Sequence, residues 1–235
     1  MSATANADRG EREHLVISRS LRKLLVPGPG YNLSFSGDPE RPQVEAFIAD
    51  KFRNHHGARV TAFLPALLSI SCQGRYTAAL GINPAASGAL FLERYLDHPA
   101  EQVVAAIART PVSRAGIVEI GNLVSSLGGS SALLYLILLA VIHRAGYHWV
   151  MFTATPEVQR GIGKLGFKIA PVCAADPARL DNPQQWGSYY RDRPQVMLGY
   201  IGESFQGCHD NLLLESVLEL SADAIDQLTN KLGAL

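Results

Sequence analysis

The 235-residue sequence contains only three cysteines, Cys72, Cys173 and Cys208, which are widely spaced and form no CxxC pair. An odd number of separated cysteines favours neither a disulfide framework nor a zinc or redox site. We therefore expect reduced, mostly buried thiols in a cytoplasmic protein. The histidines show no HxxxH or similar spacing, so we predict no metal site.

The chain has no excess of either charge, because 21 basic residues balance 21 acidic ones. This balance removes the usual electrostatic argument for a nucleic-acid or anionic-membrane partner. The N-terminal sequence MSATANADRGEREHLVISRS is polar and lacks the apolar run of a secretory signal. The longest apolar stretch, residues 132–142, would span roughly 16 Å as a helix against the ~30 Å core of a bilayer, so we predict no transmembrane segment.

No clear linker divides the chain, which favours one domain with a tail at each end. Residues 1–30 are polar and end in Pro27-Gly28-Pro29-Gly30, a stretch that breaks both helix and strand, so we expect a flexible N-terminal arm. Residues 31–205 form the expected domain, and residues 206–235 form a helical tail. Within that tail, residues 213–232 predict one amphipathic helix that packs on the body or on a partner.

Hydrophobic periodicity and turn residues predict a mixed α/β (α+β) fold. In the first half, the pattern predicts a helix over 44–52, a hairpin of residues 63–72 and 76–82, a short strand at 90–92, and a helix over 99–108. In the second half, it predicts a strand at 117–124, a helix at 131–144, a strand at 148–153, a short helix at 156–164 and a further strand. The parallel strands should form a right-handed βαβ unit.

The turn after the 117–124 strand carries Gly128, Gly129, Ser130 and Ser131. Free backbone N–H groups and the positive end of the helix dipole at such a turn favour a phosphate or pyrophosphate. An ordinary strand-to-helix turn with a serine N-cap is the alternative. Neither a Walker loop nor a GxGxxG dinucleotide fingerprint is present.

The order strand, glycine turn, apolar helix, strand, short helix and Lys164-Leu165-Gly166-Phe167 resembles the central half of the GNAT acyltransferase superfamily, over residues 115–172. The resemblance implies a GNAT-like central mixed β-sheet flanked by helices. It also implies that the 117–124 strand, at Leu123 and Val124, pairs with the pantetheine arm of acyl-CoA or an acylated carrier protein. The turn that begins at Ser125 would hold the pyrophosphate. A bulge, here expected at Gly121, would part that strand from its neighbour.

The chain departs from the GNAT pattern at two places. Ser125 and Ser130 replace the first and last residues of the usual turn, and Ile162 occupies the position of the usual tyrosine acid. Another group must therefore protonate the leaving thiolate, or no such chemistry occurs.

Four short sequence motifs, in the order in which they occur, resemble the bacterial thermostable haemolysin family over residues 31–202. They are Glu93-Arg94-Tyr95-Leu96-Asp97, Glu119-Ile120-Gly121-Asn122-Leu123, Phe152-Thr153-Ala154-Thr155 and Trp186-Gly187-Ser188-Tyr189-Tyr190. That family is distantly similar to homoserine-lactone autoinducer synthases, GNAT-fold enzymes that take acyl groups from acyl carrier protein. A carrier-protein donor has no adenosine diphosphate moiety, so it would tolerate the altered turn.

Glu119 lies in an apolar strand, where burial should raise its pKa or recruit a cation. That environment suits a general base for an acceptor amine, and an ion pair with Arg94 or Arg114 is the alternative. A bulge at Gly121 would bring Asn122 to the same cleft, unless Asn122 only satisfies backbone groups there.

Glu93 is a candidate second carboxylate for holding an ammonium group, with surface solvation as the alternative. Thr153 and Thr155 end a strand at the carboxyl edge, where α/β sheets bind ligands, although they equally suit the cap of the following helix. Tyr189 is a candidate replacement acid, and an aromatic core is the alternative for it and its neighbours.

These features predict an acyltransferase that moves an acyl group from acyl-CoA or acyl carrier protein to a small amine or amino acid. The expected co-substrate is the acyl thioester, without a metal. The alternatives are a membrane-acting haemolysin, which the family name implies, and a non-catalytic GNAT-like module that binds thioesters.

Overall fold

The computed structural model describes residues 28–126 and 129–235, so most of the expected N-terminal arm lies outside the described residues. A seven-stranded sheet has the order β1-β2-β3-β4-β5-β7-β6. Only β4 and β5 run parallel, and the other neighbours are antiparallel. The strands are β1 (Gly30–Phe35), β2 (Ala66–Cys72), β3 (Arg75–Pro84), β4 (Ile117–Ser125), β5 (Trp149–Ala154), β6 (Ile169–Ala174) and β7 (Gln195–Tyr200).

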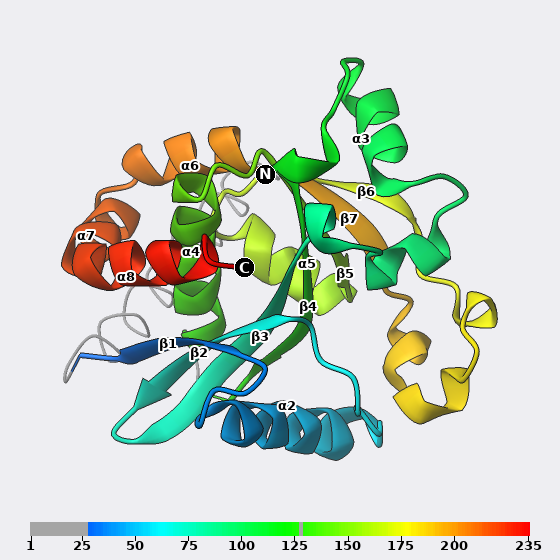
Figure 1. Cartoon of the computed structure of the whole chain (residues 1–235), viewed down its shortest axis with the longest axis horizontal. Coiled ribbons are helices and arrows are strands. Elements are labelled where there is room, and N and C mark those ends of the chain that lie inside the picture. The colour runs from blue at the N-terminus through cyan, green and yellow to red at the C-terminus, as the bar shows by residue number, and fades with distance from the viewer. Residues whose placement is uncertain (1–27, 127–128) are drawn as a thin grey trace, which may run out of the picture.

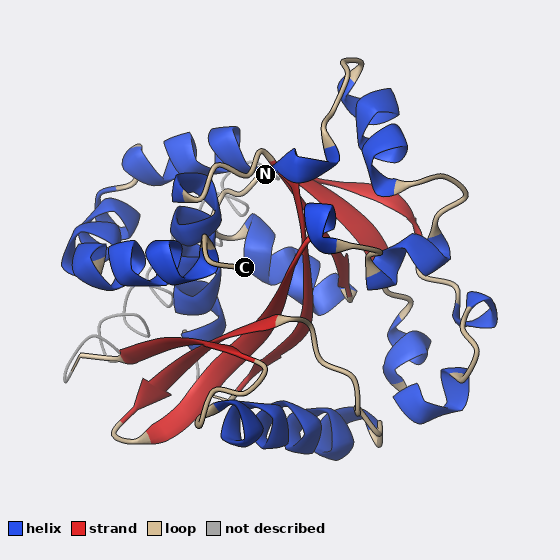
Figure 2. Cartoon of the chain, viewed as in Figure 1, coloured by secondary structure: helices blue, strands red, loops and turns tan. Residues whose placement is uncertain are grey.

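Helices cover both faces of this sheet (Figures 1 and 2). They are α2 (Arg41–His56), α3 (Ala100–Ala108), α4 (Ser130–Arg144), α5 (Pro156–Gly163), α6 (Ile201–His209), α7 (Leu212–Leu220) and α8 (Ala222–Leu232). The last three gather around α4 on one face, and α2 packs against β3 and β4 on the other (Figure 1). The predicted mixed sheet flanked by helices is therefore confirmed.

The central βαβ unit follows the predicted order, with α4 between the parallel strands β4 and β5. Residues 133–142 of α4 are all buried, because the sheet covers one side of the helix and α6, α7 and α8 cover others. This explains why α4 is apolar on nearly every side. In the described ranges, no helix is both long and apolar enough to cross a membrane.

The predicted hairpin is also present and joins β2 to β3 through Gln73 and Gly74. Both residues have positive φ, 52° and 74°, as in the two-residue turns that match the twist of paired strands.

Two local predictions differ from the structure, and two strands were not predicted. Residues 90–92 do not form a strand; they lead into a 3-10 helix, η2 (Phe91–Tyr95), whose first N–H groups are bound by a carboxylate of β4. The tail forms two helices with Ser221 between them, and both pack on α4. The sequence patterns also missed β1 and β7, and β7 inserts between β5 and β6.

Candidate functional site

The parallel strands β4 and β5 part in the middle of the sheet. Residues 117–120 of β4 pair with residues 149–152 of β5, and within the described strands no pairing between the two continues beyond Ile120 and Phe152. Past that point β4 stays paired with β3 as far as Ser125, and β5 stays paired with β7 as far as Ala154. The edge of β4 that faces β5 therefore leaves main-chain groups of residues 121–125 without a strand partner.

A bulge lies at the start of this gap, on the β4 side. Ala79 pairs with Val124 and Gly81 with Gly121, so two steps along β3 correspond to three along β4. Asn122 takes up the extra residue in a left-handed conformation with φ 52°. The expected bulge is present, but its extra residue is Asn122 rather than Gly121. Asparagine tolerates the positive φ angle of this position better than most residues do.

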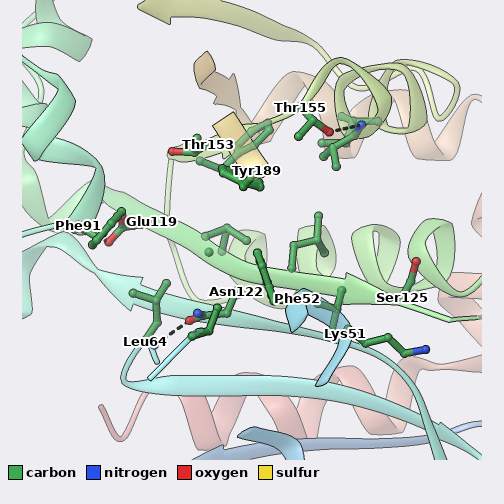
Figure 3. A pocket seen from close by; sticks show the side chains of 18 of the residues that line it. Lys51, Phe52, Leu64, Phe91, Glu119, Asn122, Ser125, Thr153, Thr155 and Tyr189 are labelled. Carbon is green, nitrogen blue, oxygen red and sulfur yellow. Dashed lines mark hydrogen bonds between the residues drawn. The ribbon is translucent and has the colours of Figure 1, made fainter. Parts of the chain in front are cut away.

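The side chain of Asn122 joins β4 to the loop that precedes β2. Its Oδ1 accepts a hydrogen bond from the Leu64 backbone N–H at 2.9 Å, and its Nδ2 donates to the Ala62 carbonyl at 3.3 Å (Figure 3). The buried Arg41 guanidinium donates to the carbonyls of Leu64 and Pro65 in the same loop. Asn122 thus satisfies backbone groups, which was the alternative to a catalytic role.

A cavity of about 650 Å³ crosses the sheet at the gap between β4 and β5. On the α4 face its walls are aliphatic and aromatic, because they belong to the main hydrophobic core. On the α2 face its walls carry aromatic rings and titratable groups. The α4-face compartment is lined by Tyr135, Leu138, Leu139, Ile142, Phe152, Val158 and Ile162, and the α2-face compartment by Phe52, His56, Phe91, Glu119, Trp186, Tyr189 and Tyr190.

Glu119 is the buried carboxylate of the site, with an exposed fraction of 3%. It accepts hydrogen bonds from the backbone N–H groups of Phe91 (3.0 Å) and Leu92 (2.8 Å) and from Asn83 Nδ2 (3.2 Å). Burial raises the pKa of this carboxyl, and the three hydrogen bonds oppose the rise.

The arginines proposed as alternative partners of Glu119 have other partners. Arg114 pairs with Glu93 and Glu101, and Arg94 pairs with Asp181. Among the described residues, Glu119 therefore has no arginine partner, and its charge is compensated by backbone and amide N–H groups.

Glu93 does not belong to the described lining of the cavity. Its carboxylate accepts two hydrogen bonds from Arg114, at 2.6 and 2.9 Å, and others from the N–H groups of Leu90 and Ala100. The Arg114 guanidinium is the main cause that lowers the pKa of Glu93 to about 2. The expected second carboxylate of the cleft is thus engaged in an ion pair outside it.

The predicted donor-binding residues divide into two groups. In the first group, Ser125 lies on β4 beyond the predicted catalytic residues Glu119 and Asn122, and Thr153 lies across the gap on β5 (Figure 3). The cavity is lined by Leu123, Val124, Ser125, Thr153 and Thr155. Thr155 also caps α5, since its Oγ1 accepts from the Val158 N–H at 3.5 Å.

The second group lies at the start of α4. Gly129, with φ 89°, is the N-cap, and Ser130 and Ser131 are the first helical residues. Ser130 Oγ is buried, with no hydrogen-bond partner in the described parts of the chain. Gly128 lies outside the described residues.

Aromatic side chains wall the α2-face compartment. Trp186 ends η5 (Pro183–Trp186), and Tyr189 and Tyr190 begin η6 (Tyr189–Asp192); all three line the cavity. Tyr189 contacts the Phe52 ring at 6.2 Å between centroids, and burial raises the pKa of its phenol. The segment is fixed to the end of α2, since the Ser188 N–H donates to the His56 carbonyl at 2.7 Å.

His56 also lines the cavity and was not predicted from the sequence. It is the last residue of α2, where a basic side chain ordinarily interacts with the helix dipole, so nothing local distinguished it. In the structure its ring lies edge-on to Tyr189, 5.2 Å between centroids. Over the described ranges, no cluster of His, Cys, Asp or Glu is arranged to hold a metal ion.

Comparison with known proteins gives one family match. The sequence profile of the family described as Thermostable hemolysin matches residues 35–205. No curated protein matches the chain.

Solved structures share the fold at low sequence identity. The CoA-dependent acyl-homoserine lactone synthase BjaI, solved with MTA, is 14% identical with a TM-score of 0.53, covering 81% of this chain and 90% of its own. FeeM, an N-acyl amino acid synthase from uncultured soil microbes, is 13% identical with a TM-score of 0.51 and coverage of 80% and 97%. The AHL synthase LasI is 11% identical, with a TM-score of 0.51 and coverage of 74% and 90%. The fold is the GNAT-like fold predicted from the sequence.

Proposed function

This chain belongs to the thermostable hemolysin family, and we propose that it transfers an acyl group from an acyl thioester to a small amine or amino acid. The donor is acyl-CoA or an acylated carrier protein. The names of the structurally similar proteins, acyl-homoserine lactone synthases and an N-acyl amino acid synthase, support a reaction of this class.

The parting of β4 from β5 is the observation that carries the proposal. An exposed strand edge binds extended ligands through its free N–H and C=O groups. The pantetheine arm of the donor is extended and contains amide groups. It would pair with Leu123 and Val124 and lie near Ser125, Thr153 and Thr155, which line the same cavity.

The acyl chain would enter the α4-face compartment. Leu138, Leu139, Ile142 and Ile162 contribute apolar surface there, and burial of an alkyl chain against such surface stabilises binding by ~0.8 kcal/mol per methylene. The thioester carbonyl would then lie at the gap, where the two compartments meet.

The acceptor amine would enter from the α2 face. A carboxylate offers about four acceptor sites, and Glu119 uses three, so one remains to orient an amine at the gap. Tyr189 keeps its proton at neutral pH, since the ordinary pKa of its phenol is 10 and burial raises that pKa further. It is our candidate for protonating the leaving thiolate, the role that Ile162 cannot fill.

Incubation with acyl thioesters and pooled amines, followed by mass spectrometry, tests the proposal. The donor arms are acyl-CoA and acylated carrier protein of matched chain length, and the acceptors are amino acids and small amines. We expect thioester loss with a matching acyl-amine product. Leu139→Trp, which fills the α4-face compartment, should abolish the product, whereas Leu212→Trp, at an 81% exposed leucine, should not.

Two results would count against catalysis. If every donor and acceptor gave thioester loss only at the rate of the buffer control, the proposed enzymatic function would be contradicted. Tight thioester binding by calorimetry without turnover would instead indicate the non-catalytic binding module.

A further inference from the structure

We propose that His56 is the base that takes the proton from the acceptor amine during acyl transfer. This inference rests on the proposed function and adds a residue that the sequence did not identify. It assigns separate roles to two groups of the α2-face compartment: Glu119 orients the amine, and the imidazole of His56 accepts its proton.

The position of His56 fits a base that faces the acceptor. His56 lines the cavity together with Phe52, Glu119 and Tyr189. The ring lies beside Phe52, Tyr189 and His55, at 6.0, 5.2 and 4.5 Å between centroids. The backbone carbonyl of His56 accepts the hydrogen bond from the Ser188 N–H, which joins the end of α2 to the start of η6.

The ring nitrogens of His56 are not committed elsewhere. Among the described residues, no hydrogen bond to its side chain is found, and ring contacts account for its packing. Glu119, by contrast, is held by three donors. The imidazole is therefore the less constrained proton acceptor of the compartment.

The surroundings of His56 also favour its neutral form. Burial lowers the pKa of the imidazole, and neighbouring His55 on α2 lowers it further, while Asp192 on η6 has the opposite effect. Tyr189, the other titratable neighbour, stays neutral because its pKa is raised. At neutral pH His56 can thus receive a proton.

The reaction balances without a further reagent. The amine nitrogen attacks the thioester carbonyl carbon, the C–N bond forms, and the amine proton passes to His56. The tetrahedral intermediate collapses, the C–S bond breaks, and the thiolate leaves with its electron pair. Tyr189 gives the thiolate a proton, and the imidazolium of His56 returns a proton to the tyrosinate directly or through water.

His56→Ala tests the inference, because it removes the imidazole and keeps the backbone carbonyl bound by Ser188. We expect kcat at pH 7 to fall ~100-fold or more, the usual contribution of a positioned base, with unchanged thioester affinity by calorimetry. Added imidazole should restore part of the rate in this variant alone. His98→Ala removes an exposed histidine from the loop before α3, and it should leave kcat unchanged.

The pH profile gives a second readout. The pKa of His56 is lowered from the ordinary histidine value of 6.5. In the unaltered protein, kcat/KM should therefore fall only at pH values below 6.5, and His56→Ala should lack that fall. An unchanged rate in His56→Ala, or a loss that imidazole does not restore, overturns the inference. If the unaltered protein consumes no thioester, the proposed function itself is wrong. If the unaltered protein does consume thioester, either of those two results contradicts only the role of His56.

Discussion

Oδ1 of Asn122 accepts a hydrogen bond from the backbone N–H of Leu64 at 2.9 Å, between residues that are 58 positions apart in the sequence. Asn122 also forms the bulge where β4 begins to leave β5. One side chain therefore fixes both the start of the gap and the loop over the α2-face compartment. This relationship explains why an asparagine, which accepts positive φ and bonds backbone groups, occupies the position.

Asn122→Ala should destabilise the protein more than Asn122→Gly. Both variants lose the hydrogen bonds to the part-buried Leu64 N–H and the exposed Ala62 carbonyl, at a cost of ~0.5–1.5 kcal/mol for each bond. Alanine at φ 52° adds roughly 1–2 kcal/mol of strain that glycine avoids. Urea unfolding of the two variants measures the difference, and a glycine variant no more stable than the alanine variant contradicts this account.

Gly187→Ala should displace the aromatic wall of the acceptor compartment. An added Cβ at Gly187, which has φ 55°, would clash with the His56 backbone oxygen, so the segment that carries Trp186 and Tyr189 must move. We expect a loss of ~1–3 kcal/mol in unfolding free energy, with altered tryptophan fluorescence. The control is Gly207→Ala in α6, where a Cβ meets open space and helix propensity predicts a small gain. Equal melting temperatures for the two variants would contradict the close contact between Gly187 and the His56 backbone oxygen.

Because of the ion pair between Glu93 and Arg114, the free energy of unfolding should depend on pH in the acid range. The folded pKa of Glu93 is about 2, below the ordinary 4.5, so its stabilisation is present above pH 4.5 and is lost as pH falls toward 2. Glu93→Gln should lower the unfolding free energy by ~1.5–3 kcal/mol at pH 7, the range for hydrogen bonds to a charged group.

That deficit should shrink between pH 4.5 and pH 2, as followed by denaturant titration at each pH. Asp50→Asn breaks the exposed pair with Arg53 and is the matched control, with an expected change below ~1 kcal/mol. A deficit for Glu93→Gln that is constant from pH 7 to pH 2 would show that the charge of Glu93 is not its source.

Tyr189→Phe should slow acyl transfer by removing the proton donor while keeping the ring that packs on Phe52. General acids contribute ~100-fold or more, so we expect a fall of that size in kcat with alkyl thioesters. The fall should be smaller with aryl thioesters, whose thiolates leave without protonation. Tyr147→Phe, at another partly buried tyrosine, is the control. Equal losses with both donor types would assign Tyr189 a packing role only.

The sequence predicted the part of the fold that depends on local pattern. The order β4, α4, β5 and α5 follows from apolar periodicity with glycine and proline at the boundaries, because each of these elements is long or sharply ended. The pattern failed at residues 90–92, where the Glu119 carboxylate, distant in sequence, binds the N–H groups of Phe91 and Leu92 and favours a 3-10 turn. Only the folded chain brings that carboxylate near.

The sequence also predicted part of the candidate site, but not all of it. Glu119 and Asn122 line one cavity, as the expected bulge predicted, and Tyr189, the candidate replacement acid, lines the same cavity. Glu93 was misplaced, because its ion pair with Arg114 depends on a tertiary contact. His56 was missed because its partner Tyr189 lies far along the chain, and no spacing rule connects a helix end to a distant 3-10 turn.

A crystal structure with a stable thioether analogue of acyl-pantetheine would show whether the donor binds in the gap between β4 and β5. We expect the pantetheine amides to form hydrogen bonds with the main chain of Leu123 and Val124 there, with the alkyl chain against Leu139 and Ile142. A ligand bound elsewhere, or strands paired beyond Ile120 and Phe152 with the ligand excluded, would contradict this expectation.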